Sequence, residues 1–306
     1  MKNEYYVCGI DGGGTKTTAI CRNLQGEEIA RRVFGPLNLN SIGEEAFREI
    51  LNETVLFLRQ TGNCRALCIG AAGTTNSQVA ECVKNTLSAS GIPYRLLGDY
   101  EIAHTGALDG KQGIILISGT GSVCFGKTAH GRTAMAGGWG HLLGDEGSGY
   151  GLGHDALRAV SRLYDGYGEP TILKDLLALK CGLDSQEKIV THVYSNDKSA
   201  VAALSFLVDE AFHENDPVAV RIVNDNAKAL ADLVLAVSNR LELNACKVAL
   251  LGGLLENPTP LRAQLIKLLD EANPMLKCTQ PLHSAAEGAV MEAFSLYMHN
   301  ESNGDN

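Results

Sequence analysis

The stretch Val7-Cys8-Gly9-Ile10-Asp11-Gly12-Gly13-Gly14-Thr15-Lys16-Thr17-Thr18-Ala19-Ile20-Cys21 decides how the rest of the chain is interpreted. Two short apolar runs, each suited to a buried strand, are joined by a carboxylate, three glycines and several hydroxyls. Glycine has no Cβ, so it can adopt positive φ and bring its N–H close to an anion. We therefore predict a tight hairpin in which Gly12, Gly13 and Gly14 form a concave donor site for phosphate, with Thr15 and Thr17 adding hydroxyl donors.

Asp11 indicates that a cation takes part at this hairpin. A carboxylate beside a polyphosphate is repelled unless a positive ion lies between them, and Mg²⁺ is the hard ion that oxygen ligands prefer. The alternative is a glycine-rich β-turn that binds nothing. The stretch is not a P-loop, because Thr15 stands where that motif needs lysine and a second strand, not a helix, is expected next.

Composition is that of a globular protein with two domains. The chain has 306 residues, which exceeds the usual size of a domain with a single hydrophobic core. Its net charge is −9, and it has no basic block. These values argue against nucleic acid or an anionic membrane as partner. We see no apolar run of membrane-spanning length and no signal peptide at Met1–Glu4, so we expect a cytoplasmic protein. The nine cysteines lack C-x-x-C spacing and are expected to be reduced, mostly buried thiols.

The opening pattern recurs in the middle of the chain. Gly113 to Gly126 again reads strand, glycine and hydroxyl turn, strand, with Gly119-Thr120-Gly121-Ser122 at the turn. This internal repeat predicts an α/β fold of two similar domains, 1–112 and 113–283, which face each other across a cleft and hold one polyphosphate between their hairpins. Two unrelated glycine-rich turns are the alternative. The closing helix, about 284–298, is a candidate to pack back on the first domain, and residues 301–306 are expected to be a disordered tail.

Three further places carry candidate chemistry. Asp99 follows a strand at the edge where ligands bind in open α/β sheets, although strand-end Asp residues are also ordinary helix N-caps. The loop from Gly137 to Gly151 holds the only Trp, Trp139, whose flat face suits a sugar ring, and Asp145 and Glu146, which can accept hydrogen bonds from its hydroxyls. The alternative for this acidic pair is an N-cap of the next helix, about 150–164.

Two remaining features are assigned more simply. His141, in the same loop, is interpreted as a structural residue. Gly252 and Gly253 end a buried strand, so a planar base or ribose could lie against bare backbone there.

Together these motifs resemble those of a known superfamily. Asp11 to Thr17, Gly119 to Ser122 and Leu251-Gly252-Gly253 are similar to the two phosphate motifs and the adenosine motif of the actin, sugar kinase and Hsp70 superfamily. The loop Gly137-Gly138-Trp139-Gly140-His141 with Gly144 to Ser148 resembles more narrowly the N-acetylglucosamine kinase branch of the BadF/BadG type ATPases. The resemblance spans about residues 5–295. It implies two ribonuclease-H-like domains with ATP and sugar in the cleft, and transfer of the γ-phosphoryl to a sugar hydroxyl, usually O6.

The resemblance also implies roles for individual residues. Asp99 matches the general base, which accepts the proton of the attacking hydroxyl and orients it. Asp11 matches the carboxylate associated with Mg²⁺, acting through water. The nucleotide site is matched by Gly12, Gly13, Gly14, Thr15, Lys16, Gly119, Thr120, Gly121, Ser122, Gly252 and Gly253, and the sugar site by Asn38, Gly138, Trp139 and Asp145.

Several alternatives stay open at this point. Leu37 and Leu39, beside Asn38, leave the size of the sugar pocket open between N-acetylglucosamine, N-acetylmuramic acid and glucosamine. A compact chain of bacterial type could serve the recycling of cell-wall sugars. The same superfamily includes ATPase activators of 2-hydroxyacyl-CoA dehydratases, but the cysteine arrangement of those activators is not visible in this sequence. It also includes sugar sensors that bind without turnover, but a DNA-binding extension before the first strand is not visible either. A homodimer is expected, and the roles of His141 and Glu146 are left open.

Overall fold

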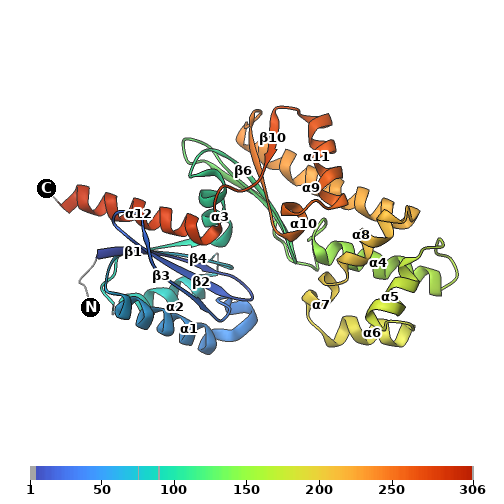
Figure 1. The fold of residues 1–306 in the computed structure, drawn as a ribbon, viewed down its shortest axis with the longest axis horizontal. Coiled ribbons are helices and arrows are strands. Elements are labelled where there is room, and N and C mark those ends of the chain that lie inside the picture. The colour runs from blue at the N-terminus through green and yellow to red at the C-terminus, as the bar shows by residue number, and fades with distance from the viewer. Residues whose placement is uncertain (1–4, 75, 89, 305–306) are drawn as a thin grey trace. The chain divides into compact units, whose positions relative to one another are not determined.

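The computed structural model describes residues 5–74, 76–88 and 90–304, and it divides the chain into two compact units. Unit 1 consists of Met1–Lys111 and Pro281–Asn306, and unit 2 of Gln112–Gln280. The N-terminal Met1–Glu4, expected to lead directly into the first strand, lies outside the described residues. Figure 1 shows the course of the chain, with the C-terminal helix α12 among the elements of unit 1.

Unit 1 is built on a five-stranded sheet in the order β3-β2-β1-β4-β5. The first three strands are antiparallel, because β2 pairs with both β1 and β3. β4 pairs in parallel with β1, and β5 pairs in parallel with β4. The bounds are β1 (Tyr5–Gly12), β2 (Thr17–Asn23), β3 (Glu28–Phe34), β4 (Asn63–Ala71) and β5 (Tyr94–Gly98). The helices are α1 (Leu39–Thr61), α2 (Ser77–Ser88), α3 (Asp99–Leu108) and α12 (Ala285–Gly304).

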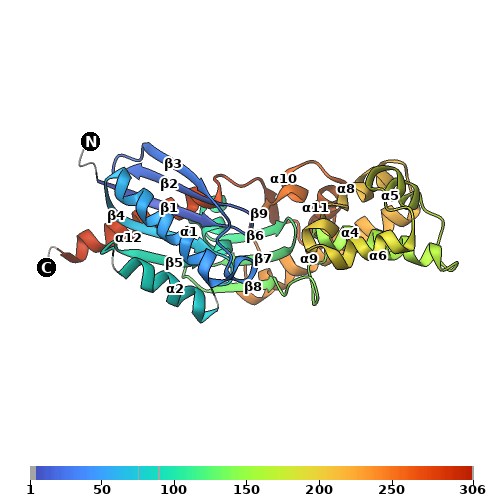
Figure 2. The ribbon, with the colours of Figure 1, turned by 90° about the horizontal axis from the view of Figure 1, so that it is seen from below.

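The alternation of side chains along β1 distributes the helices between the two faces of this sheet. Tyr6, Cys8 and Ile10 are buried in the cluster that α1 and α2 cover. Val7 faces the opposite cluster, which contains Ile102 of α3 and three alanines of α12. Both faces of the strand are therefore apolar, as expected of a central strand covered by helices on two sides, and Figures 1 and 2 show α1 and α2 on the face opposite α12.

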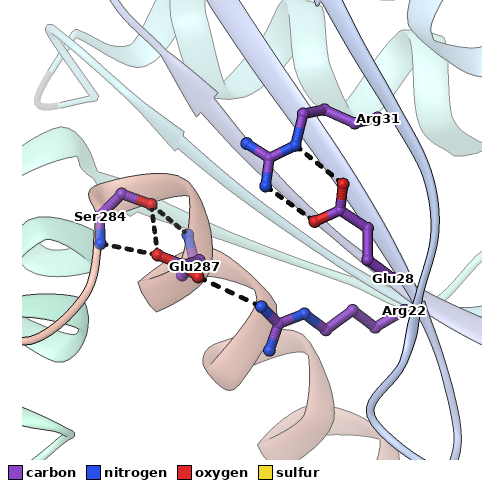
Figure 3. Close-up of polar contacts among 5 residues, drawn as sticks. All are labelled: Arg22, Glu28, Arg31, Ser284 and Glu287. Carbon is purple, nitrogen blue, oxygen red and sulfur yellow. Dashed lines mark hydrogen bonds and ion pairs between the residues drawn. The ribbon is translucent and has the colours of Figure 1, made fainter.

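The start of α12 is fixed by polar contacts with β2 (Figure 3). Ser284 and Glu287 form a reciprocal cap: the Glu287 carboxylate accepts the Ser284 N–H at 3.0 Å, and the Ser284 hydroxyl accepts the Glu287 N–H at 3.3 Å. Arg22 of β2 donates to the other oxygen of Glu287 at 3.2 Å. These charged hydrogen bonds lower the pKa of Glu287. The cap and the ion pair thus position the first turn of α12 against the sheet.

The helix continues further than the sequence predicted. We expected 301–306 to be a disordered tail, but α12 runs to Gly304, and only 305–306 lie outside the described residues. Glu301 forms an ion pair with Arg65 of β4 at 3.2 Å, and the Ser302 hydroxyl donates to the Met298 carbonyl at 3.0 Å. The expectation from polar composition was wrong for 301–304 because these polar groups find partners on the folded unit.

Unit 2 repeats the sheet of unit 1. Its order is β10-β9-β6-β7-β8, with β7 antiparallel to β6 and β8, and with β6, β9 and β10 parallel. Strand order and directions are the same as in unit 1, so the prediction of two α/β units of similar topology, made from the sequence repeat, is confirmed. The bounds are β6 (Gly113–Ser118), β7 (Ser122–Lys127), β8 (Thr133–Gly137), β9 (Cys246–Leu251) and β10 (Leu276–Thr279).

The helices of unit 2 share one large apolar core with this sheet. The long helix α9 begins at Pro217, where the Asp216 side chain caps it by accepting the N–H groups of Val218 and Ala219 at 3.0 and 2.9 Å. Between β8 and α9 lies a helical insertion, α4 to α8. The bounds are α4 (Gly149–Tyr164), α5 (Leu173–Cys181), α6 (Gln186–Ser195), α7 (Lys198–Ala202), α8 (Ser205–His213), α9 (Pro217–Leu241), α10 (Gly253–Glu256) and α11 (Pro260–Ala272).

Two further expectations concern the cysteines and the membrane. All nine cysteines are free thiols and none is exposed; burial raises the pKa of Cys64 and of Cys68 to about 12. Five of the nine are buried and four are partly buried, which agrees with the predicted burial of these thiols. Over the described residues, no helix has the length and apolar character needed to cross a membrane.

Candidate active site

The first hairpin turns between β1 and β2, and close packing rather than backbone handedness explains its glycines. The Gly13 N–H donates to the Lys16 carbonyl at 3.1 Å and closes the turn. We expected positive φ in Gly12 to Gly14, but none of the three has it. A Cβ on Gly12 would stand 2.9 Å from the Leu37 side chain, and one on Gly13 would stand 3.1 Å from the Lys16 carbonyl. The turn thus requires glycine because other backbone and side-chain atoms approach it.

The hydroxyls around this turn differ in what they are free to do. Thr17 is fully buried, and its hydroxyl donates to the Gly35 carbonyl at 2.7 Å, so the expected role of Thr17 as a donor to a ligand is wrong. Thr15 and Lys16 lie on the exposed tip. Asn38 reaches the same turn from the loop after β3, with its side-chain nitrogen 3.8 Å from where a Gly14 Cβ would be. Asn38 and the hairpin are therefore neighbours, although 24 positions separate Asn38 from Gly14 in the sequence.

Asp99 is the first residue of α3 and directly follows β5. The helix is not capped by Asp99, because Gly98 occupies the N-cap and Glu101 accepts the Gly98 N–H at 2.7 Å. The Asp99 side chain accepts the N–H of Tyr100 at 3.0 Å instead. The N-cap interpretation of Asp99 is thus wrong, and its carboxylate lies at the carboxyl edge of the sheet, where open α/β sheets bind ligands.

Burial and the nearby Asp99 carboxylate both act on the charge of Asp11. Burial, together with the nearby Asp99 carboxylate, raises the pKa of Asp11 from 3.8 to about 6, while Lys16 acts in the opposite direction. Burial also raises the pKa of Asp99, although the Tyr100 N–H lowers it in part. Two poorly hydrated carboxylates are therefore brought close together from β1 and α3. Such an arrangement is unfavourable for stability and is typical of functional sites.

The second hairpin, between β6 and β7, is enclosed by two other segments of unit 2. Gly252, the residue after β9, has φ +90, and a Cβ there would stand 2.2 Å from the Ser118 carbonyl oxygen. This close approach places the Gly252-Gly253 turn beside Gly119. Thr120 is exposed, whereas Ser122 is buried with its hydroxyl donating to the Glu146 carbonyl at 2.8 Å. The predicted base site and phosphate hairpin of this unit are therefore adjacent.

The loop after β8 wraps onto the second hairpin. The Asp145 carboxylate accepts the Ser122 N–H at 3.0 Å, the Ser118 hydroxyl donates to the Gly147 carbonyl at 2.6 Å, and the Gly149 N–H donates to the Gly119 carbonyl at 2.8 Å. Asp145 is only 4% exposed. The N-cap of α4 is Ser148, so the alternative of an Asp145 or Glu146 cap is wrong.

The remainder of this loop is open. Trp139 is 74% exposed, and Gly137, Gly138 and Gly140 on either side of it all have positive φ. The His141 ring packs edge-on against Tyr150, with 5.0 Å between ring centroids, in line with its structural interpretation. An exposed indole on a glycine-rich loop can cover the apolar face of a ligand, because it has few packing contacts within the unit to lose when it does so.

Sequence reasoning missed two residues that shape this loop. Asn226 of α9 is buried; its side-chain oxygen accepts the Gly147 N–H at 2.7 Å, and its side-chain nitrogen donates to the Asp155 carboxylate at 2.9 Å. A polar residue on the apolar side of α9 was a visible signal of such a contact. The Lys198 ammonium group of α7 lies 3.6 Å from the Asp145 carboxylate, and no local sequence pattern around Lys198 predicts this ion pair.

The predicted site residues therefore form one group in each unit. In unit 1 the first hairpin, Asn38, Asp11 and Asp99 gather at the carboxyl edge of the sheet; in unit 2 the second hairpin, Asp145 and Gly252 gather at the corresponding edge. Two sheets of one topology, each with a glycine hairpin at this edge, define the actin-like fold of the sugar kinases.

Comparison with known proteins identifies the family. Residues 8–293 match the model of the BadF/BadG/BcrA/BcrD ATPase family, and the chain belongs to that family. It is 35% identical to the N-acetylmuramic acid/N-acetylglucosamine kinase of Clostridium acetobutylicum over 95% of this chain and 98% of that protein. It is 29% identical to the N-acetyl-D-glucosamine kinase of Dictyostelium discoideum over 96% and 99%. A solved structure from Chromobacterium violaceum, provisionally assigned as an N-acetylglucosamine kinase, superposes with a TM-score of 0.74 at 25% identity, covering 97% of this chain and 100% of that one.

Proposed function

We propose that this protein transfers the γ-phosphoryl group of ATP to the O6 hydroxyl of an N-acetylated amino sugar, with Asp99 as general base. The chain is an ATP-dependent sugar kinase, since its family and its curated relatives are of that class. The observation that supports the proposed mechanism most directly is the pair formed by Asp11 and Asp99 at the sheet edge. Phosphoryl transfer uses one group that accepts the proton of the acceptor hydroxyl and one that holds the cation, and a carboxylate can serve in either role.

Asp99 has the properties of the base. Burial raises the pKa of Asp99, and a higher pKa makes its carboxylate a stronger proton acceptor. The N–H of Tyr100 fixes one carboxylate oxygen at 3.0 Å, so the other can be directed at a sugar hydroxyl. The proposed base would take the hydroxyl proton as the O–P bond forms, and the bond between the β,γ-bridging oxygen and the γ-phosphorus would break.

Mg²⁺ fits the residues of unit 1 as an ion brought with the nucleotide. Asp11 is ionised against the cost of burial and the repulsion of Asp99, so a divalent cation nearby would relieve both effects. Within the described residues no group of three or more His, Cys, Asp or Glu side chains could hold a metal alone. We therefore propose that Asp11 contacts the ion through water, while phosphate oxygens complete its ligands. The ion would supply charge neutralisation at the phosphates.

The sugar is proposed from the relatives. N-acetylmuramic acid and N-acetylglucosamine are both named for the Clostridium acetobutylicum kinase, and a 26% identical protein of Vibrio cholerae is named as a glucosamine kinase. We favour the N-acetylated sugars, with Asn38, Gly138, Trp139 and Asp145 as their contacts. Phosphorylation of N-acetylmuramic acid would connect the enzyme to the recycling of cell-wall sugars, and we further propose that the enzyme acts as a homodimer.

A sugar panel tests this proposal. N-acetylglucosamine, N-acetylmuramic acid, glucosamine, glucose and 6-deoxy-N-acetylglucosamine would each be incubated with ATP and Mg²⁺, and products identified by mass. We expect a phosphate added to the N-acetylated sugars and none added to the 6-deoxy analogue. Preference for glucosamine would overturn the proposed substrate, and phosphorylation of the 6-deoxy sugar would overturn the O6 assignment. Light scattering of the pure protein would test the dimer.

A further inference from the structure

Asp145 places a buried negative charge directly behind the second hairpin. Its Oδ1 atom accepts the Ser122 N–H at 3.0 Å, and a Cβ on Gly121 would stand only 2.7 Å from the same oxygen. The backbone of Asp145 has φ +69, a left-handed conformation that Asp and Asn tolerate better than most residues. The carboxylate is thus held against the hairpin backbone by the loop that carries it.

The second oxygen of Asp145 lacks a hydrogen bond. Oδ2 is buried, and within the described part of the chain no donor lies in hydrogen-bond range of it. Its nearest cation is the Lys198 ammonium group of α7, at 3.6 Å, on a side chain that is 39% exposed. A buried carboxylate with one oxygen unsatisfied is costly unless a charge compensates it. In the protein without sugar, Lys198 is the group positioned to do so.

The sequence of α4 fixes α7, and with it Lys198, in this position. A Cβ on Gly153 would stand 2.0 Å from the Val201 carbonyl oxygen, and one on Gly149 would stand 3.2 Å from the Ala202 carbonyl oxygen. Two glycines on α4 therefore let the short helix α7 approach its backbone closely. This packing fixes the backbone that carries Lys198, and the Lys198 side chain extends from it to Asp145.

We infer that Lys198 is a positioning residue for the nucleotide, which neutralises Asp145 and so allows the second hairpin to accept a polyphosphate. Without Lys198, an uncompensated carboxylate would lie behind Gly121 and repel the phosphates. It would also attract water or another cation, and so loosen its hold on the Ser122 N–H. Lys198 acts through Asp145 and is not itself a phosphate ligand. This inference rests on the proposed binding of ATP at the hairpin.

A double-mutant cycle tests the inference. Binding of Mg·ADP without sugar would be measured by calorimetry for wild type, Lys198→Met, Asp145→Asn and the double variant. We expect Lys198→Met to weaken binding about tenfold. The loss is smaller than for a fully buried charge pair, because the lysine is partly exposed to solvent. In the Asp145→Asn background the same change should alter binding less than about twofold, since no charge is left to compensate. Lys198→Arg should restore most of the affinity.

The matched control is Lys188→Met, which removes an exposed ion pair with Asp184 in the same helical insertion and should leave ADP binding unchanged. Equal affinities of Lys198→Met and Lys188→Met would overturn the inference. So would additive losses in the double variant, which would make Lys198 a direct phosphate ligand. If Lys198→Met alone fails to fold, Lys198→Gln replaces it in the same cycle and decides between these outcomes. A wild-type protein that binds no Mg·ADP would overturn the proposed function as well.

Discussion

Gly288 of α12 lies directly against the Ile102 carbonyl of α3, so closely that a Cβ on Gly288 would stand 2.0 Å from the oxygen. The approach is reciprocal, because a Cβ on Gly106 of α3 would stand 2.3 Å from the Ser284 carbonyl oxygen. Helices that meet backbone to backbone leave no room for adjustment. The helix that begins with Asp99 is therefore held by a segment from the other end of the chain.

Replacing Gly288 with alanine should destabilise unit 1. The added methyl group would force α3 and α12 apart, at a cost of roughly 1–3 kcal/mol or more, despite the better helix propensity of alanine. Urea denaturation would measure the loss. Ser295→Ala, an exposed change on the same helix, should be neutral or slightly stabilising. Equal stability of the two variants would contradict the close packing.

Replacing Asp99 with asparagine should remove turnover while leaving sugar affinity within a small factor. The base acts mainly in the transition state, and its loss commonly lowers kcat by about 10²–10⁴-fold. Steady-state kinetics and sugar binding by calorimetry would be compared. Asp109→Asn, at the exposed C-terminal end of the same helix, is the control and should keep full activity. Full activity in Asp99→Asn would remove Asp99 from the mechanism.

The raised pKa of Asp11 has a defined consequence for stability against pH. The folded carboxyl, with a pKa of about 6 against 3.8, binds its proton more tightly than in the unfolded chain. Its stabilising contribution is therefore present below pH 4 and is lost as the pH rises through 6, by at most about 3 kcal/mol. Asp11→Asn has no such loss. The ligand-free variant should thus gain Tm over wild type between pH 4 and 7, although it loses activity.

Thermal melts of ligand-free protein at several pH values would test this sign. Glu49→Gln, on the exposed side of α1 in the same unit, provides the control for removing an acid and should show no growing difference. A Tm difference between Asp11→Asn and wild type that is constant with pH would contradict the burial of an ionised Asp11.

Trp139 allows sugar binding to be followed directly, because it is the only tryptophan and is 74% exposed in the free structure. If a sugar ring covers the indole, fluorescence should shift to shorter wavelength and acrylamide quenching should fall when N-acetylglucosamine is added. Trp139→Ala should raise KM for the sugar by roughly 10-fold, with a smaller effect on ADP binding. Glucose, which lacks the amino substituent, is the comparison ligand. Unchanged quenching at saturating sugar would show that the loop does not contact the substrate.

The fold was largely predictable because its signals are local. The apolar runs around Asp11 and around Gly119 each predicted a hairpin, and their repetition predicted two sheets of the same topology. Periodicity and glycine placement act over a few residues, so a linear reading detects them. The length of α12 was missed, since Glu301 is stabilised by Arg65, a residue far away in sequence.

The positions of the candidate residues in the fold were more predictable than their contacts. Composition singled out Asp11, Asp99 and Asp145 correctly as residues at strand ends and loops. It could not show that the Thr17 hydroxyl donates a hydrogen bond to the Gly35 carbonyl. Nor could it show that the N–H and the hydroxyl of Ser122 both donate hydrogen bonds within unit 2. A hydroxyl in a sequence is only a candidate donor, because its partner is chosen by burial and by chain segments that arrive later.

The sequence by itself determined two α/β sheets, each with a glycine hairpin, and the placement of acidic residues at the ends of their strands. Hydrophobic alternation and the absence of Cβ atoms are properties of the residues themselves, so they require no neighbours to be recognised. Tertiary structure alone decided that burial and the nearby Asp99 raise the pKa of Asp11, and that Lys198 lies beside Asp145. Electrostatic pairing depends on distance and burial, and both exist only once the chain has folded.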